Sequence, residues 1–302
     1  MENANKIKII VALCMLIVLG VGLIQVANNY ASTKNKEIQV SQSKKKKRKN
    51  KVKTVSTRSR DETLDNEILT YLNEAGIDMD KIAYSICDQE NGEVYSYNED
   101  TEFTAASTYK LPLAMLYYDK INDGEITLET TYQLLPNMYE DNSIIAADYS
   151  TYSQVPLSEI LENMIVWSDN VAGHILYENL GGWKEYKEAT LKYTSVTTDN
   201  YISYDNVITA HQMNDILNYL YENQDNYSDL IQYMKESKSH DYLDKEIQID
   251  MPQKYGAIDA YCNAAGFVEA THPYTIAVYT DLADEGVDIM AHINQIIYNH
   301  FN

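Results

Sequence analysis

Strand-like segments lie near both ends of residues 61–302, and a long helical stretch separates them. The segments KIAYSICD and EVYSYNE, joined through Asn91-Gly92, have the alternation and the turn residues of a β-hairpin. Strand patterns return only late in the chain, in MPQKYGAI, AAGFVEA and YTIAVYTD. This order predicts an α+β fold, in which both ends of the chain build an antiparallel sheet and an all-helical subdomain is inserted.

Apolar residues at helical spacing predict helices at both ends of this folded part. DETLDNEILTYLNEAG near the start and GVDIMAHINQIIYNHF at the end supply the flanking N- and C-terminal helices. Further helices are expected at 107–121, 157–166, 169–180 and 209–222. We therefore expect one folded domain at 61–302, with the helical insertion at about 107–206.

The part before this domain has two distinct segments. After a short tail at 1–8, residues 9–27 form an uncharged apolar run, long enough to be a transmembrane anchor or an uncleaved signal. Residues 28–60 form a polybasic polar linker that contains KKKKRKNKVK. This lysine run has three interpretations: a nucleic-acid patch, a surface for anionic lipid or wall polymer, or a solvated tether, which is the simplest.

Charge divides the chain at the same place. Residues 61–302 carry 43 of the 45 acidic side chains, ten lysines and no arginine. Such an acidic surface keeps a domain soluble and repels nucleic acid, so we expect no nucleic-acid partner. Cys14, Cys87 and Cys262 lack the spacing of a disulfide framework, and the six histidines lack a metal-ligand spacing. We expect free thiols, no metal and no other cofactor.

A serine and a lysine three positions apart lie in FTAASTYKLPLAML. Ser107 and Lys110 would share one helix face, and Pro112 indicates that the helix begins close to Ser107. A buried lysine near other cations loses its proton near neutral pH and accepts one from a serine. The same spacing at Ser41 and Lys44, in the linker, shows that this pair alone also fits an ordinary polar helix start.

A second polar group interrupts the apolar stretch MIVWSDNVAGHIL. Ser168, Asp169 and Asn170 would be costly to bury without partners, so their position favours a functional role. The alternative is a helix N-cap, with Ser168 or Asp169 capping VAGHIL.

A third group lies on a late strand. Lys254 would supply a second cation, and Gly256 would let a substrate approach the strand closely. The alternative is an exposed strand lysine with no role in a site.

The order Ser-x-x-Lys, Ser-Asp-Asn, Lys-x-Gly is typical of the serine β-lactamase and penicillin-binding (D-alanyl-D-alanine peptidase) superfamily, and the chain resembles class A β-lactamases most. The resemblance covers about 61–302, including FTAASTYKLPLAMLYYDKINDGEITLET and the pair Gly181-Gly182. It implies a β-lactamase/transpeptidase-like fold and the chemistry of a serine hydrolase.

Residue by residue, the resemblance implies that Ser107 is the acylated nucleophile, Lys110 its base and Ser168 a proton relay to the leaving group. Lys254 would help to bind a substrate carboxylate and would tune the electrostatics of the site. The backbone N–H groups of Ser107 and Ala257 would form the oxyanion hole. Substrate-binding roles are implied for four residues, namely Asn170, Tyr255, Gly256 and Ala257.

The sequence departs from the family pattern in two places. The segment 192–206, KYTSVTTDNYISYDN, lacks the deacylating glutamate of class A enzymes, and Asp199 and Asp205 are its only carboxylates. Tyr255 replaces a small hydroxyl residue, and the domain has no arginine for a bidentate carboxylate clamp. We therefore expect an acyl-enzyme serine hydrolase of a cell-wall peptide or related amide that hydrolyses β-lactams poorly.

A non-catalytic wall-binding or sensory module on the same fold is the alternative, and a β-lactamase with another deacylating group is a third. Both leading interpretations place the domain outside a single-pass plasma-membrane anchor, or in the medium if the anchor is cleaved. The lysine run favours the opposite orientation, but large domains translocate largely regardless of flanking charge. On the extracellular side, the lysine run would face anionic wall polymer. The natural substrate and the oligomeric state stay open.

Overall fold

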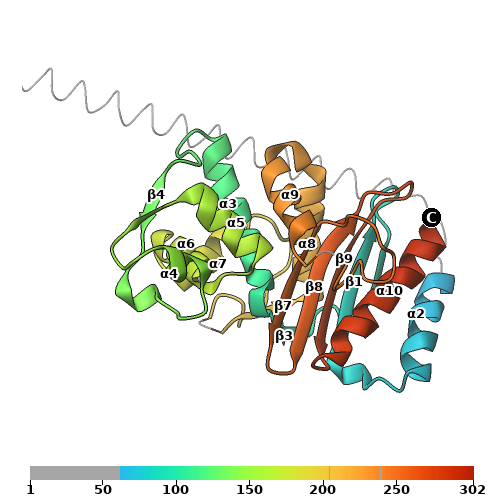
Figure 1. Cartoon of the computed structure of the whole chain (residues 1–302). Helices are drawn as coiled ribbons and strands as arrows, with labels where there is room; N and C mark the ends of the chain where they lie inside the picture. The colour runs from blue at the N-terminus through green and yellow to red at the C-terminus, as the bar shows by residue number, and fades with distance from the viewer. Residues whose placement is uncertain (1–61, 204, 239) are drawn as a thin grey trace, which may run out of the picture. The chain divides into compact units, whose positions relative to one another are not determined.

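A computed structural model describes residues 62–203, 205–238 and 240–302. Its main sheet has five antiparallel strands in the order β2-β1-β9-β8-β7 (Figure 1). The strands are β1 (Ile82–Asp88), β2 (Val94–Tyr97), β7 (Gln253–Ile258), β8 (Tyr261–Val268) and β9 (Tyr274–Asp281). The N-terminal hairpin thus joins three strands from the end of the chain, which confirms the predicted sheet.

Both faces of this sheet are covered, which explains why its strands are nearly continuous apolar runs. On β9, Ile276 and Val278 belong to the core shared with α2 (Glu62–Glu74) and α10 (Glu285–Phe301). Ala277, between them, belongs to the core of the helical block. Figure 1 shows α2 and α10 side by side on one side of the sheet, with the helical block on the other.

The helical block follows the predicted positions closely. The expected helix at 107–121 begins as a 3₁₀ turn, η2 (Ala106–Tyr109), before it becomes α-helical. Three helices that the pattern did not indicate, α4, α7 and α9, are also present. The helices are α3 (Lys110–Asn122), α4 (Ile144–Asp148), α5 (Leu157–Val166), α6 (Asn170–Asn179), α7 (Trp183–Thr190), α8 (Ala210–Glu222) and α9 (Ser228–Glu236).

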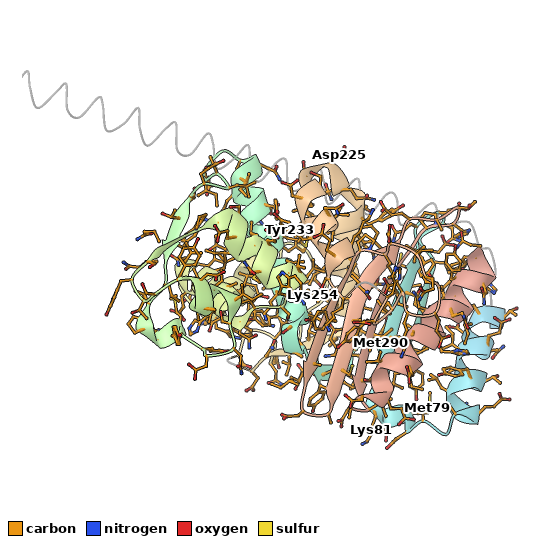
Figure 2. All side chains as sticks on the ribbon, viewed as in Figure 1. Met79, Lys81, Asp225, Tyr233, Lys254 and Met290 are labelled. Atoms are coloured by element: carbon orange, nitrogen blue, oxygen red, sulfur yellow. The ribbon has the colours of Figure 1, made fainter. Side chains whose placement is uncertain are left out.

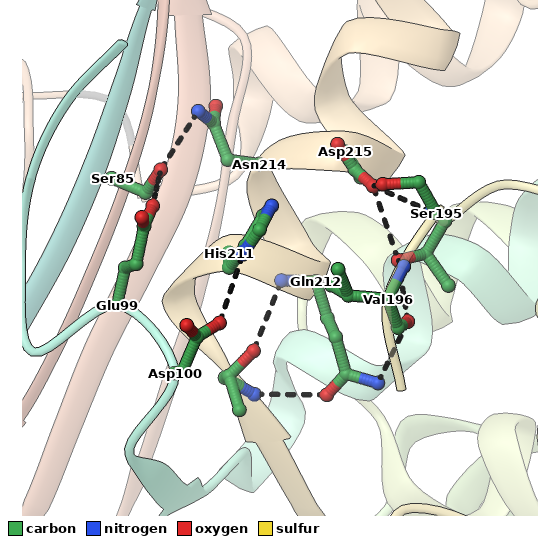
Figure 3. Close-up of polar contacts among 11 residues, drawn as sticks. Ser85, Glu99, Asp100, Ser195, Val196, His211, Gln212, Asn214 and Asp215 are labelled. Carbon is green, nitrogen blue, oxygen red and sulfur yellow. Dashed lines mark hydrogen bonds and ion pairs between the residues drawn. The ribbon is translucent and has the colours of Figure 1, made fainter. Parts of the chain in front are cut away.

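Two short strand pairs accompany the helical block, one at its border with the rest of the chain and one inside it. They are β3 (Glu102–Thr104) with β6 (Val207–Thr209), and β4 (Thr131–Gln133) with β5 (Gln154–Pro156). Helix α8, which packs on β9, begins directly after β6 with a capping box formed by Thr209 and Gln212. Figure 3 shows this helix start, where Asp215 also accepts hydrogen bonds from the backbone and the hydroxyl of Ser195, each at 2.6 Å. These contacts hold the segment 192–206 against the first turns of α8.

None of the helices in residues 62–302, leaving out 204 and 239, is long and apolar enough to cross a membrane. The expected anchor at 9–27 and the linker at 28–60 lie outside the described residues and stay predictions, as do the domain boundaries. Cys87 and Cys262 are buried free thiols, as expected. Cys14 lies outside the described residues.

Candidate active site

Ser107 is the second residue of η2, directly before α3. The residue before it, Ala106, has a φ of +48°, a strained value for a residue with a Cβ atom. Three side chains hold this turn by donating to the carbonyl oxygens before Ser107. They are Asn263 to Thr104 at 2.8 Å, Thr108 to Ala105 at 2.7 Å, and Asn206 to Ala106 at 2.9 Å. The turn that carries Ser107, named the nucleophile turn here after the role expected for that residue, is therefore tied to β8 and to the end of the 192–206 segment.

Gly256 lies against this turn. A Cβ atom added to Gly256 would be 2.6 Å from the backbone nitrogen of Ser107, so only glycine lets β7 approach so closely. The close neighbour of Gly256 in the structure is the nucleophile turn, and the approach of a substrate to this glycine stays a prediction. Ala257 follows on the same strand and is exposed at the edge of the sheet. This places Ala257 on the strand beside the backbone N–H of Ser107.

Lys110, on the first turn of α3, is fully buried. Its Nζ donates to Ser107 Oγ at 3.1 Å, to Ser168 O at 2.6 Å and Oγ at 3.3 Å, and to Asn170 Oδ1 at 2.7 Å. Burial lowers the pKa of Lys110 to about 7, although the negative charges of Asp169 and Glu140 oppose this effect. Near neutral pH the amine is thus partly uncharged and able to accept the Ser107 proton.

The turn between α5 and α6 brings three of these four oxygen atoms to Lys110, two from Ser168 and one from Asn170. Ser168 has a φ of +59°, which lets the chain turn sharply before α6 begins. The buried Asp169 caps α6 by accepting from Ala172 N at 3.0 Å, and the Ser143 hydroxyl donates to its carboxylate, with Oγ 2.9 Å from Oδ1 and 2.8 Å from Oδ2. The capping interpretation therefore holds for Asp169, while Ser168 and Asn170 contact Lys110.

Lys254 is fully buried, so the alternative of an exposed strand lysine is wrong. Figure 2 shows it where the helical block meets the sheet. Its Nζ donates to Tyr255 O at 3.0 Å and lies 4.0 Å from the centre of the Tyr255 ring. Burial, and then the charge of Lys110, hold the pKa of Lys254 well below its usual value. Burial raises the pKa of Tyr255, and a side-chain hydrogen bond with Ser168 opposes this. Contacts therefore connect Lys254, through Tyr255 and Ser168, to Lys110.

Two residues near the site were not identified from the sequence. Asn206 supports the nucleophile turn, and Glu140 accepts a hydrogen bond from Asn170 Nδ2 at 3.3 Å. Neither belongs to a motif, and no local pattern marks them. Asp199 and Asp205, the two carboxylates of the 192–206 segment, are both exposed.

A cavity of about 700 Å³ lies beside the nucleophile turn. Aromatic rings form part of its wall, and Asn206 lines it as well. The rings belong to Tyr109, Tyr177 and Trp183.

One group of side chains in the described part of the chain has a composition suited to a metal ion. Ligand atoms of Glu99, Asp100 and His211 lie within 4.8 Å of one another, at the start of α8 (Figure 3). His211 Nδ1 is 2.9 Å from Asp100 Oδ1, and Ser85 Oγ donates to Glu99 at 3.2 Å. These contacts are those of an ordinary partly exposed ion pair, and none of them involves Ser107 or Lys110.

Solved structures similar to this chain share its fold. PBP-A is 18% identical with a TM-score of 0.70, over 82% of this chain and 99% of that chain. The TLA-3 extended-spectrum beta-lactamase is 22% identical with a TM-score of 0.67, over 79% of this chain and 98% of that one. A beta-lactamase from Chitinophaga pinensis DSM 2588 is 20% identical with a TM-score of 0.67, over 78% of this chain and 100% of that chain.

No curated protein matches the chain. The model of a family described as the beta-lactamase enzyme family matches residues 62–301. This match spans almost the whole described region, including Ser107, Lys110, Ser168 and Lys254. The chain therefore belongs to the beta-lactamase enzyme family.

Proposed function

We propose that this protein is a serine hydrolase that forms an acyl-enzyme on Ser107 and acts on a cell-wall peptide or a related amide. One observation carries the proposal: the fully buried Lys110 amine, with a pKa of about 7, lies 3.1 Å from Ser107 Oγ. A serine hydroxyl is a weak nucleophile, and an adjacent base with a pKa near the working pH activates it.

In the acylation step, uncharged Lys110 takes the proton of Ser107 as Oγ attacks the carbonyl carbon of the substrate. The developing oxyanion is stabilised by backbone N–H groups of Ser107 and Ala257. As the carbon–nitrogen bond breaks, the proton leaves Lys110 through Ser168 Oγ, 3.3 Å away, for the leaving amine. The products are the free amine and an ester on Ser107, and Lys110 is again uncharged.

In the deacylation step, water attacks the ester, and Lys110 accepts the proton of this water and returns it to Ser107. The 192–206 segment has no glutamate, and its two aspartates are exposed. We therefore propose that deacylation is slow and that β-lactams are hydrolysed poorly.

A non-catalytic wall-binding or sensory module is the second candidate. Tyr255 favours it, because the half-buried ring lies over the Lys254 amine and contacts Ser168, where a substrate carboxylate would otherwise be bound. In that case the buried polar groups would serve recognition without acyl transfer.

We further propose that residues 9–27 anchor the protein, with the domain on the extracellular side and the lysine run against anionic wall polymer. Protease added to intact cells is expected to digest the domain. Protection from that protease would rule out this orientation.

Intact-mass spectrometry after incubation with a fluorescent penicillin tests the catalytic proposal, with Ser107→Ala as the control. A lasting adduct on the parent protein alone would support an activated Ser107 with slow deacylation. If no adduct forms with the penicillin or with a panel of ester and peptide substrates, the binding module is the better interpretation.

A further inference from the structure

Glu140 lies between η3 (Pro136–Met138) and α4, and its side chain reaches the candidate active site. Glu140 Oε2 accepts from Asn170 Nδ2 at 3.3 Å, while Asn170 Oδ1 accepts from Lys110 Nζ at 2.7 Å. These two bonds fix the orientation of the Asn170 amide, because reversing it would set its NH₂ group against the Lys110 amine. Nδ2 carries two hydrogen atoms, so one remains free to bind a substrate carbonyl oxygen.

The charge of Glu140 has little compensation. Its side chain is exposed, and it forms no ion pair with a lysine or histidine of residues 62–203, 205–238 and 240–302. The negative charge of Glu140 interacts electrostatically with Lys110. However, burial keeps the pKa of Lys110 at about 7, so this amine carries only part of a charge near neutral pH. The domain has no arginine to supply another cation.

Two exposed aromatic side chains adjoin these residues in the chain. Tyr139, next to Glu140, is 44% exposed, and Trp167, next to Ser168, is 62% exposed. Single exposed hydrophobic residues are ordinary, but here each neighbours a residue of the site. An exposed carboxylate suits an ammonium ion, which forms charge-assisted hydrogen bonds with it, and an exposed aromatic ring within reach would add a cation–π contact.

We propose that Glu140 is a specificity-determining residue that binds a primary ammonium group on the acyl side of the substrate. The inference rests on the proposed function, because it places the amide carbonyl of the substrate at the free hydrogen of Asn170 Nδ2. Glu140 Oε2 is 3.3 Å from Asn170 Nδ2. A side chain on the substrate residue whose carbonyl binds this nitrogen would therefore lie near Glu140. An ammonium there pairs with Glu140, and an anionic group is repelled.

Two peptides that differ by one charge test this proposal. Nα-acetyl-L-lysyl-D-alanyl-D-alanine carries the ammonium group, and its Nα,Nε-diacetyl derivative does not. Their binding to the full-length Ser107→Ala protein is measured by isothermal titration calorimetry. We expect the ammonium peptide to bind about threefold to fivefold more tightly, the upper part of the range for an exposed ion pair, and about 0.5 M NaCl to reduce the preference.

Substitutions at Glu140, made in the Ser107→Ala protein, separate its charge from its hydrogen bond. Glu140→Gln retains an acceptor for Asn170 Nδ2, so the diacetyl peptide should bind unchanged while the preference for the ammonium peptide disappears. Glu140→Lys should reverse the preference. Asp141→Asn is the matched control, because Asp141 is also exposed and loses the same charge, and the preference should remain.

The inference is overturned if both peptides bind the Ser107→Ala protein equally, if neither binds, or if Asp141→Asn removes the preference as fully as Glu140→Gln. Acylation of the parent protein by a fluorescent penicillin, measured in parallel, separates the two proposals. If the penicillin acylates Ser107 but the two peptides bind equally, the Glu140 proposal is wrong and the hydrolase proposal stands. If the ammonium peptide is preferred but no substrate acylates Ser107, the Glu140 proposal stands and the hydrolase proposal is wrong.

Discussion

Lys110 is buried among uncharged oxygen atoms, and under the proposed mechanism this environment sets the pH at which Ser107 can react. Protonated Lys110 has a full charge in a buried site, which is unfavourable, so burial lowers its pKa to about 7. Because burial of the amine is what lowers this pKa, the proposed chemistry depends on the packing of α3 and α6 around Lys110 as well as on the motif residues.

The rate of Ser107 acylation should therefore depend on pH. Below a pH of about 7 we expect the rate to fall about tenfold per unit, because only uncharged Lys110 accepts the proton, and above it the rate should level off. Intact-mass kinetics with a fluorescent penicillin measure this, with circular dichroism at each pH to verify that the protein stays folded. A rate that does not change between about pH 5.5 and about pH 8.5 would show that Lys110 is not the base.

Gly256 offers a second test at the same scale. In Gly256→Ala, the new Cβ atom would be 2.6 Å from Ser107 N, so β7 must move away from the nucleophile turn. We expect a loss of about 1–3 kcal/mol in the free energy of unfolding, and acylation at least about tenfold slower. Urea denaturation and acylation kinetics measure the two effects.

Gly124→Ala is the control for that substitution. Gly124, unlike Gly256, has a positive φ of +73°, and no atom lies within 4 Å of the added Cβ. This substitution should therefore cost stability through backbone strain and leave acylation unchanged. Equal effects of both variants on acylation would mean that the contact between β7 and the turn has no special role.

At the scale of elements, the sequence predicted long regular segments well and short or polar ones poorly. The sheet strands and α5 were recognised because their apolar runs are several residues long and have a clear period. The strands β3 and β6 have three residues each, too few to show alternation. Helix α7 was missed because its buried face includes Lys187, which a hydrophobic pattern counts as exposed.

The candidate site shows the same limit. Ser107, Lys110, Ser168 and Asn170 were identified because each belongs to a motif, and the structure places all four in contact. Glu140 contacts Asn170 across two chain segments, so no spacing in the sequence indicates the contact. Its position depends on the packing of the whole helical block.

Lys187 makes the region around α7 sensitive to pH. It is buried, donates to Val207 O at 3.1 Å and lies 3.8 Å from the centre of the Tyr201 ring. Burial lowers its pKa from 10.5 to about 7, so between these pH values the unfolded chain binds more protons than the folded one. Stability from this group therefore rises with pH across that window, and the full cost of burying the charge applies below a pH of about 7.

Lys187→Met removes this cost. We expect its free energy of unfolding to exceed that of the parent by about 1–4 kcal/mol near pH 7, and the difference to shrink toward pH 10. Urea denaturation of both proteins at several pH values measures this difference in the free energy of unfolding. The contributions of the other titrating groups are common to both proteins and cancel in the difference. Lys184→Met, at an exposed position of the same helix, should change little. A Lys187→Met protein less stable than the parent at every pH would show that the contacts of the amine outweigh its burial.

At the scale of the whole molecule, residues 61–302 carry 43 acidic side chains against ten lysines, a net charge of −33. Charges of one sign repel each other more strongly in the compact folded state than in the expanded unfolded chain. Salt screens this repulsion, since the Debye length falls from about 30 Å at 0.01 M to about 3 Å at 1 M. The folded domain should therefore be least stable at low ionic strength.

We expect the Tm of the full-length protein to rise by about 2–8 °C when NaCl is raised from about 0.02 M to about 0.5 M, which corresponds to a gain of about 1–2 kcal/mol for a domain of this size. Differential scanning calorimetry in the presence of EDTA measures the shift and removes any effect of divalent ions at Glu99, Asp100 and His211. KCl should give the same rise as NaCl, because screening depends on ionic strength and not on the identity of the cation. A rise with only one of the two salts would instead indicate a specific cation site, and a fall in Tm would mean that screened attractions outweigh the repulsion between the carboxylates.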